Sequence, residues 1–111
     1  MIHISELSKM KNGQRIFTVG WFHDYSPLHN TCILRSGEAN CNDTVELDVS
    51  SCAMDELYEV HEYCLCRIIG VIVLTDISIK IKVQSIHATP SWDYCNISKR
   101  LDLNKSLLNN A

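Results

Sequence analysis

The sequence predicts an all-β fold: a five-stranded closed barrel of Greek-key type, with a short helix between the third and fourth strands and an amphipathic helix at the C-terminus. Five strand-like runs follow one another across short turns, without an internal repeat or a flexible linker. Each of the two longest runs carries an internal glycine, Gly20 or Gly70. Closing a small barrel requires strands to bend sharply, and glycine permits the necessary bulge or close backbone approach. We expect one barrel domain over 1–92 and a helix over 93–111.

The first element is a short helical turn over Ser5–Met10 with Ser5 as its N-cap, followed by a turn at Asn12-Gly13. A long strand over 14–25 comes next. Because side chains alternate between the faces of a strand, one set should point into the barrel and the other outward. The inward set is Ile16, Thr18, Gly20 and Phe22, and the outward set is Phe17, Val19 and Trp21.

The second and third strands are short. Turn residues at 26–30 precede a strand over Thr31–Arg35, and the segment 36–42 supplies a further turn. The third strand, DTVELDV, alternates apolar and acidic residues, which is typical of a strand with one wet face. Val45, Leu47 and Val49 should point inward, with Glu46 and Asp48 outward.

The second half of the chain begins with a short helix over Cys52 to about Tyr58. Tyr63–Leu74 is apolar on both faces and indicates a fully buried or central strand. In the next run, Ile79, Ile81 and Val83 alternate with lysines and should point inward. A helix entry at 90–93 then leads into the C-terminal helix.

Composition excludes several classes of function. The chain is 46% hydrophobic with a net charge of -3, which is ordinary for a soluble globule and unlike a protein that mainly grips phosphates. Its longest apolar run, Ile68–Leu74, is too short to cross a bilayer, and no signal peptide is present, so we expect an intracellular protein without membrane contact. No catalytic motif is found. We therefore expect no enzymatic activity, no cofactor and no small-molecule substrate.

A cysteine-rich stretch raises the alternative of a metal site. His61, Cys64 and Cys66, together with Cys52 or Cys41, would supply enough ligands for zinc. Their spacing is irregular, however, and no CxxC pair exists. Two cysteines two positions apart in a strand share a face, where cysteine behaves as a small hydrophobe. Buried thiols are therefore the favoured interpretation, and no metal is predicted.

The glycine-containing strands also carry a family resemblance. Residues 13–25, GQRIFTVGWFHDY, and 62–74, EYCLCRIIGVIVL, resemble the first and fourth strands of the smallest OB-fold subunits of single-strand-binding complexes. The order of elements across nearly the whole chain is similar to the Ten subunit of the telomere-capping CST complex and, as a close second, to the small subunit of replication protein A. The N-terminal Ile-x-Ile-x-Glu-Leu pattern and the short tail after the last strand favour the Ten subunit.

The resemblance implies a non-enzymatic subunit that acts at telomeres in the nucleus, protecting chromosome ends and regulating their replication. It implies a heterodimer with a larger OB-fold subunit, formed through the C-terminal helix. Carried over to this chain, the contacts would be Tyr94, Ile97, Leu101, Leu107 and Leu108.

Single-stranded telomeric DNA is the second expected partner. Aromatic side chains that stack on bases and cations that pair with phosphates are the candidate contacts: Trp21, Tyr25, Arg35, Arg67, Lys80 and Lys82. Because an OB barrel usually binds its ligand across strands two and three, the outward Glu46 and Asp48 predict weak or shared DNA contact and stronger protein contact. For each aromatic residue taken singly, packing within the barrel or under the last helix is the favoured interpretation over base stacking. A free-standing nucleic-acid-binding module and a zinc-dependent interaction module remain alternative functions.

Overall fold

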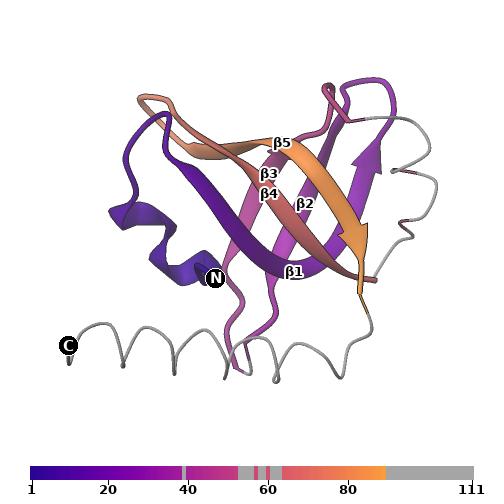
Figure 1. The fold of residues 1–111 in the computed structure, drawn as a ribbon, viewed down its shortest axis with the longest axis horizontal. Helices are drawn as coiled ribbons and strands as arrows, with labels where there is room; N and C mark the ends of the chain where they lie inside the picture. The colour runs from indigo at the N-terminus through magenta and orange to yellow at the C-terminus, as the bar shows by residue number, and fades with distance from the viewer. Residues whose placement is uncertain (39, 53–56, 58–59, 61–63, 90–111) are drawn as a thin grey trace.

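The predicted barrel is confirmed in the computed structural model, which describes residues 1–38, 40–52, 57, 60 and 64–89. A 3-10 helix, η1 (Ile4–Lys9), precedes five strands: β1 (Arg15–Ser26), β2 (Thr31–Ser36), β3 (Thr44–Asp48), β4 (Leu65–Leu74) and β5 (Ile79–Ala88). The strands close in the order β1-β2-β3-β5-β4, with β3 and β5 parallel (Figure 1). The short helix expected after β3 falls mostly outside the described residues, and the C-terminal helix entirely so.

The two strand glycines lie at close approaches of the backbone. Gly20 pairs with both Ser36 of β2 and Cys66 of β4. The part of β1 before this residue pairs with β4, and the part after it pairs mainly with β2. A Cβ atom there would collide with the carbonyl oxygen of Arg35 and lie 2.8 Å from Leu34 Cγ. At Gly70 it would lie 2.6 Å from both Ile81 Cγ2 and the Lys82 carbonyl oxygen. The predicted reason for both glycines is therefore confirmed.

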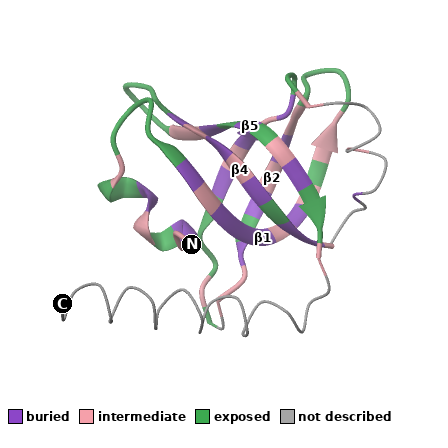
Figure 2. Cartoon of the chain, viewed as in Figure 1, coloured by how far each residue is buried: buried purple, intermediate pink, exposed green. Residues whose placement is uncertain are grey.

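Burial alternates along the strands and defines a single interior core (Figure 2). Every residue expected to point inward from β1 and β3 is buried, as are Ile81 and Val83 of β5, while Ile79 is half-buried and packs against the core. β5 carries a bulge at Gln84, since Ser85 pairs with Ile69 whereas Val83 pairs with Gly70. The extra residue restores the inward direction for Ile86, which is fully buried.

The predicted N-cap of η1 was wrong. η1 is capped by His3 rather than Ser5, and the Glu6 carboxylate accepts the His3 backbone N–H at 3.4 Å. Of the two alternatives for β4, the central strand is confirmed: β4 pairs with both β1 and β5, and its outward face leaves Arg67 and Val73 exposed. The outward-pointing Val19 is nearly inaccessible at 2% exposure. No helix in the described part of the chain is long and apolar enough to span a membrane.

A buried hydroxyl ties the N-terminal segment to β1. Thr18 Oγ1 donates a 2.6 Å hydrogen bond to the Ile2 carbonyl oxygen, and the Ile2 N–H donates to the Phe17 carbonyl at 2.8 Å. Thr18 is fully buried and Ile2 is half-buried, so the hydroxyl has little access to water as an alternative partner.

Thr18→Val should lower the free energy of unfolding by about 1–3 kcal/mol, because the valine keeps the shape but leaves the Ile2 carbonyl without its donor. Urea denaturation of the two proteins measures the difference. Thr18→Ser is the control: it keeps the hydroxyl and should lose less stability than the valine variant. Equal stability of wild type and Thr18→Val would show that the hydrogen bond contributes nothing.

Candidate nucleic-acid interface

Trp21 and Arg35 form the one pair of predicted contact residues that the structure brings directly together. They face each other across β1 and β2, with Trp21 half-buried and Arg35 exposed. Both point to the outside of the barrel, because their neighbours Phe22 and Leu34 point into the core. An aromatic ring beside a guanidinium can contact a base and its phosphate together.

Lys80 and Lys82 share a face, as expected, but each lies opposite an acid. The parallel pairing of β3 with β5 places Glu46 opposite Lys80 and Asp48 opposite Lys82. Lys80 Nζ lies 3.2 Å from Glu46 Oε2. Two positive and two negative side chains therefore lie along this seam. Their charges offset one another, so the seam attracts a phosphate backbone only weakly.

Asp48 is also held by the turn that follows β3. Its Oδ1 accepts hydrogen bonds from Ser50 Oγ at 2.6 Å and from the Ser50 N–H at 3.0 Å. The Ser50 hydrogen bonds, followed by the positive charges of Lys82 and Lys80, hold the pKa of this carboxyl below its usual value. Asp48 thus remains negatively charged throughout the physiological pH range.

Asp48→Asn should therefore reduce stability in a pH-dependent way. A carboxyl whose pKa is lowered by folding adds stability above its unfolded pKa of about 3.9, and that contribution disappears as the pH falls through the folded value. At neutral pH the variant should be less stable by roughly 0.5 kcal/mol, a small effect because the side chain is largely solvated. Urea denaturation at pH 7 and near pH 2 measures the difference in free energy of unfolding between wild type and variant, which should disappear in acid. A difference of the same size at both pH values would show that the charge of Asp48 does not stabilise the fold.

The remaining two candidates lie elsewhere. Arg67 is exposed on the outer face of β4, opposite Val19 of β1 and His87 of β5. Tyr25 packs against the core, its ring centroid 6.1 Å from that of Phe22. The positive φ of Asp24, +56°, and the register shift between His23 and Ser26 disturb the simple alternation of side chains in this part of β1.

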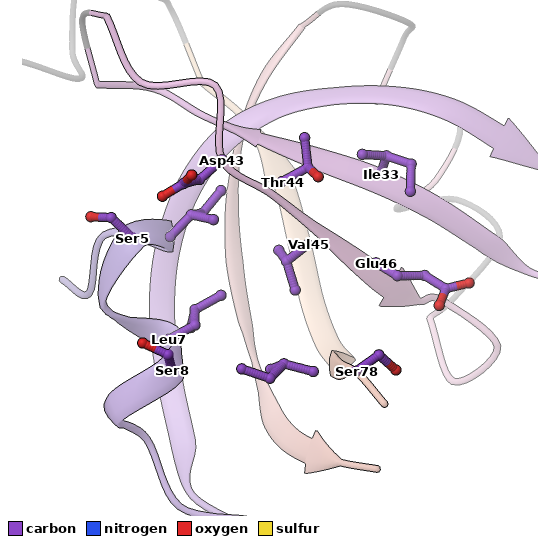
Figure 3. Close-up of a pocket in the computed structure, with 11 residues that line it drawn as sticks. Ser5, Leu7, Ser8, Ile33, Asp43, Thr44, Val45, Glu46 and Ser78 are labelled. Atoms are coloured by element: carbon purple, nitrogen blue, oxygen red, sulfur yellow. The ribbon is translucent and has the colours of Figure 1, made fainter. Parts of the chain in front are cut away.

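A groove of about 540 Å³ lies between η1 and the β3–β5 side of the barrel (Figure 3). Ile4, Leu7, Val45 and Ile79 provide apolar lining, and the Asp43 and Glu46 carboxylates are the charged groups along it. With acids and no lysine or arginine among its lining residues, this groove suits a phosphate poorly.

A smaller hollow of about 170 Å³ opens on the opposite side, on the outer face of β1, β4 and β5. Its lining residues are Phe17, Arg67, Ile69, Ser85 and His87. Only Arg67 was singled out from the sequence. The others were missed because they lie on three different strands and converge through strand pairing.

The cysteines that suggested a metal site are packed with the core. Cys66 is fully buried, Cys64 is half-buried, and their sulfur atoms lie 3.4 Å apart. Burial raises the pKa of the Cys66 thiol, which disfavours the thiolate that zinc requires. Among the described residues, no group of three His, Cys, Asp or Glu is placed to hold a metal ion. His61 lies outside the described residues.

The closed barrel, its strand order and its two glycine bends define an OB fold. Solved structures of this class are similar to the chain, beginning with the telomere capping protein Ten1 from Saccharomyces pombe: the TM-score is 0.72 and the identity 16%, over 93% of each chain. A chain of the S. pombe Stn1-ten1 complex gives a TM-score of 0.71 at 16% identity, over 93% of this chain and 88% of that one.

Replication protein A provides a further similar structure. A chain of the U. maydis protein bound to single-stranded DNA gives a TM-score of 0.64 at 16% identity, over 97% of this chain and 90% of that one. No protein-family model matches the chain, and no curated protein matches it. At these identities the likeness shows the fold. The residues expected at a partner interface, Tyr94, Ile97, Leu101, Leu107 and Leu108, lie outside the described residues.

Proposed function

We propose that this chain is a small, non-enzymatic OB-fold subunit of a telomere-capping complex that binds single-stranded DNA. The observation that carries the proposal is the extent of the match to Ten1, which covers 93% of both chains with a TM-score of 0.72. The match extends over nearly the whole length of each chain. A subunit with this role acts in the nucleus, at chromosome ends, where it protects them and regulates their replication.

Its main partner is a larger OB-fold subunit, bound through an amphipathic helix over 93–111. A chain of the Stn1-ten1 complex is among the similar structures, which supports an assembly of this kind. The same helix also packs on the barrel.

DNA binding by this subunit is weak or shared with its partner. The pairing of Lys80 with Glu46, and of Lys82 with Asp48, supports a weak contribution from the β3–β5 side of the barrel. Trp21 and Arg35 are candidate DNA contacts on the β1–β2 side. Tight binding requires additional cations, which a second subunit can supply.

Affinity purification of the full chain from its source cell, followed by identification of the proteins that co-purify, tests the proposal. We expect a one-to-one complex with a larger OB-fold protein, and chromatin precipitation of that complex should recover telomeric sequence. Recovery of the chain as a monomer, or with partners unrelated to chromosome ends, would contradict it.

A second candidate is the small subunit of replication protein A. The observation in its favour is the similarity to the U. maydis structure, which covers 97% of this chain. The same purification separates the two functions. Co-purification with general replication factors, and chromatin recovery across the genome rather than at chromosome ends, would favour the second.

A further inference from the structure

The outer face of β1, β4 and β5 carries positive charge without any acid. The part of β1 that pairs with β4, Arg15–Trp21, together with the whole of β4 and β5, contains no aspartate or glutamate. Arg15, Arg67, Lys82 and His87 are all exposed here. Glu46 and Asp48, the acids of β3, lie on the strand that pairs with β5. The part of this face without neighbouring acids is therefore the part formed by β1 and β4, away from the seam between β3 and β5.

Strand register brings the polar and aromatic members of this face together. Phe17, Ile69 and Ser85 form one row across the three strands, and Val19, Arg67 and His87 form the next row. The two rows enclose the 170 Å³ hollow, with half-buried Phe17 on one side and exposed Arg67 and His87 on the other. His87 Nε2 lies 3.0 Å from Ser85 Oγ, so a hydrogen bond connects two polar side chains that line the hollow.

The cations of this face differ in how freely they can bind a ligand. Neither Arg15 nor Arg67 forms an ion pair with another described residue. Lys82 lies between Val71 and Asp48, so its charge is partly offset. The two arginines lie on neighbouring strands on either side of the row that contains Phe17. A chain of phosphates crossing that row would meet Arg15 and Arg67 in turn.

We propose that the outer face of β1, β4 and β5 is a binding site for single-stranded nucleic acid, in which a base stacks on Phe17 and the flanking phosphates pair with Arg67 and Arg15. The proposal deepens the function proposed above, on which it rests, and places the contact on the side of the barrel away from β2 and β3. An aromatic ring beside a cation is the recurring element of single-strand recognition. The hollow combines an aromatic ring with a cation, and unpaired bases can reach such a site because they are not stacked within a duplex.

An acidic protein segment is the competing occupant for a basic face. The structure favours nucleic acid because an acidic peptide would use the arginines but has no need of an apolar hollow bordered by Phe17 and Ile69. Charge alone does not separate the two ligands, so the experiment must test the aromatic contact as well.

Fluorescence polarisation with the purified full chain, or with its co-purified complex, tests the charges. The probe is a fluorescein-labelled oligothymidylate of about 16 nucleotides, the upper site size of one OB fold. Arg67→Glu should weaken binding about tenfold and reduce the dependence of affinity on salt, since a phosphate contact is lost. Lys9→Glu makes the same charge change on η1, outside the strands of this face, and should weaken binding less than twofold. Arg35→Glu reports separately whether the β1–β2 side contacts the DNA. Arg67→Gln serves if the glutamate variant has a lowered melting temperature.

Phe17→Leu tests the stacking contact. The leucine keeps an apolar side chain at the hollow but removes the aromatic face, so the affinity should fall about tenfold. Ultraviolet crosslinking to a bromodeoxyuridine oligonucleotide should place the adduct on the Phe17 peptide. If Arg35→Glu weakens binding and the Arg67 and Phe17 variants do not, the DNA lies on the other side and the proposal fails while the proposed function stands.

Two further outcomes are decisive. If the complex forms but the wild-type protein binds no oligonucleotide, this site does not exist. If the Arg67 variant instead releases an acidic protein partner while oligonucleotide binding is unchanged, the face is a protein interface. Failure of the chain to form any complex would refute the proposed function, independently of whether the isolated chain retains this site.

Discussion

Gly20→Ala is expected to lower the free energy of unfolding by about 3 kcal/mol, a large share of the roughly 5–15 kcal/mol that keeps a domain folded. The added methyl group would collide with the Arg35 carbonyl oxygen and crowd Leu34 Cγ at 2.8 Å. A side chain can change rotamer, but this carbonyl belongs to the paired backbone of β1 and β2. The barrel must therefore open locally to admit one carbon atom. Urea denaturation followed by circular dichroism measures the loss.

Gly13→Ala is the matched control for this prediction. Gly13 has a positive φ of +83°, yet nothing lies within 4 Å of an added Cβ. Its substitution should lower the free energy of unfolding by only about 1 kcal/mol, because an alanine is strained in the left-handed backbone conformation but meets no neighbouring atom. A Gly20→Ala variant no less stable than Gly13→Ala would mean that β1 and β2 do not approach as closely as the structure shows.

Leu101→Glu is expected to abolish the proposed complex with the larger OB-fold subunit. If residues 93–111 form a helix, Ile97, Leu101 and Leu108 lie along one stripe. A carboxylate at the centre of that stripe would have to be desolvated on binding without a partner charge, a cost of several kcal/mol. The affinity for the larger subunit should therefore fall more than a hundredfold, because each 1.4 kcal/mol of binding free energy changes the affinity about tenfold.

Size-exclusion chromatography of the co-expressed pair measures this effect. Ser106→Glu is the control, since it adds the same charge on the opposite side of the proposed helix. The control should still elute as a one-to-one complex, and Leu108→Glu should behave like Leu101→Glu. If both leucine variants remain in an intact complex, the helix is not the interface.

Much of the fold could be predicted because its signals are local. Alternation in DTVELDV assigns Leu47 inward and Glu46 outward, as the structure has them. Gly20 and Gly70 stand out in runs that otherwise avoid glycine, and both prove to be close approaches. The cap of η1 was misassigned because serine is the usual N-cap, whereas the Glu6 carboxylate here reaches the His3 backbone. The Gln84 bulge could not be predicted from the sequence of β5 alone, because a bulge is defined by the pairing of β5 with β4.

The candidate site was harder to predict, since alternation gives the face of a residue but not its neighbours on other strands. Lys80 looked like a free cation until the parallel closure of β3 on β5 placed Glu46 beside it. Trp21 and Arg35 were chosen separately, and antiparallel pairing made them adjacent. Phe17 and His87 were passed over because each is unremarkable in its own strand. Their shared hollow depends on the register of β1 and β5 against β4.

The parallel seam between β3 and β5 also sets the order in which the chain can fold. Every other strand pair is antiparallel, but Glu46 and Lys80 are separated in sequence by the whole of β4 and the segments around it. Pairing over such a separation carries a loop-closure cost that the β1–β2 and β2–β3 hairpins do not, so it forms after them. During synthesis, β1, β2 and β3 emerge first and wait with an unpaired strand edge until β5 leaves the ribosome. An exposed edge of this kind pairs readily with other chains, so a nascent copy of this protein is most vulnerable to aggregation just before its final strand arrives.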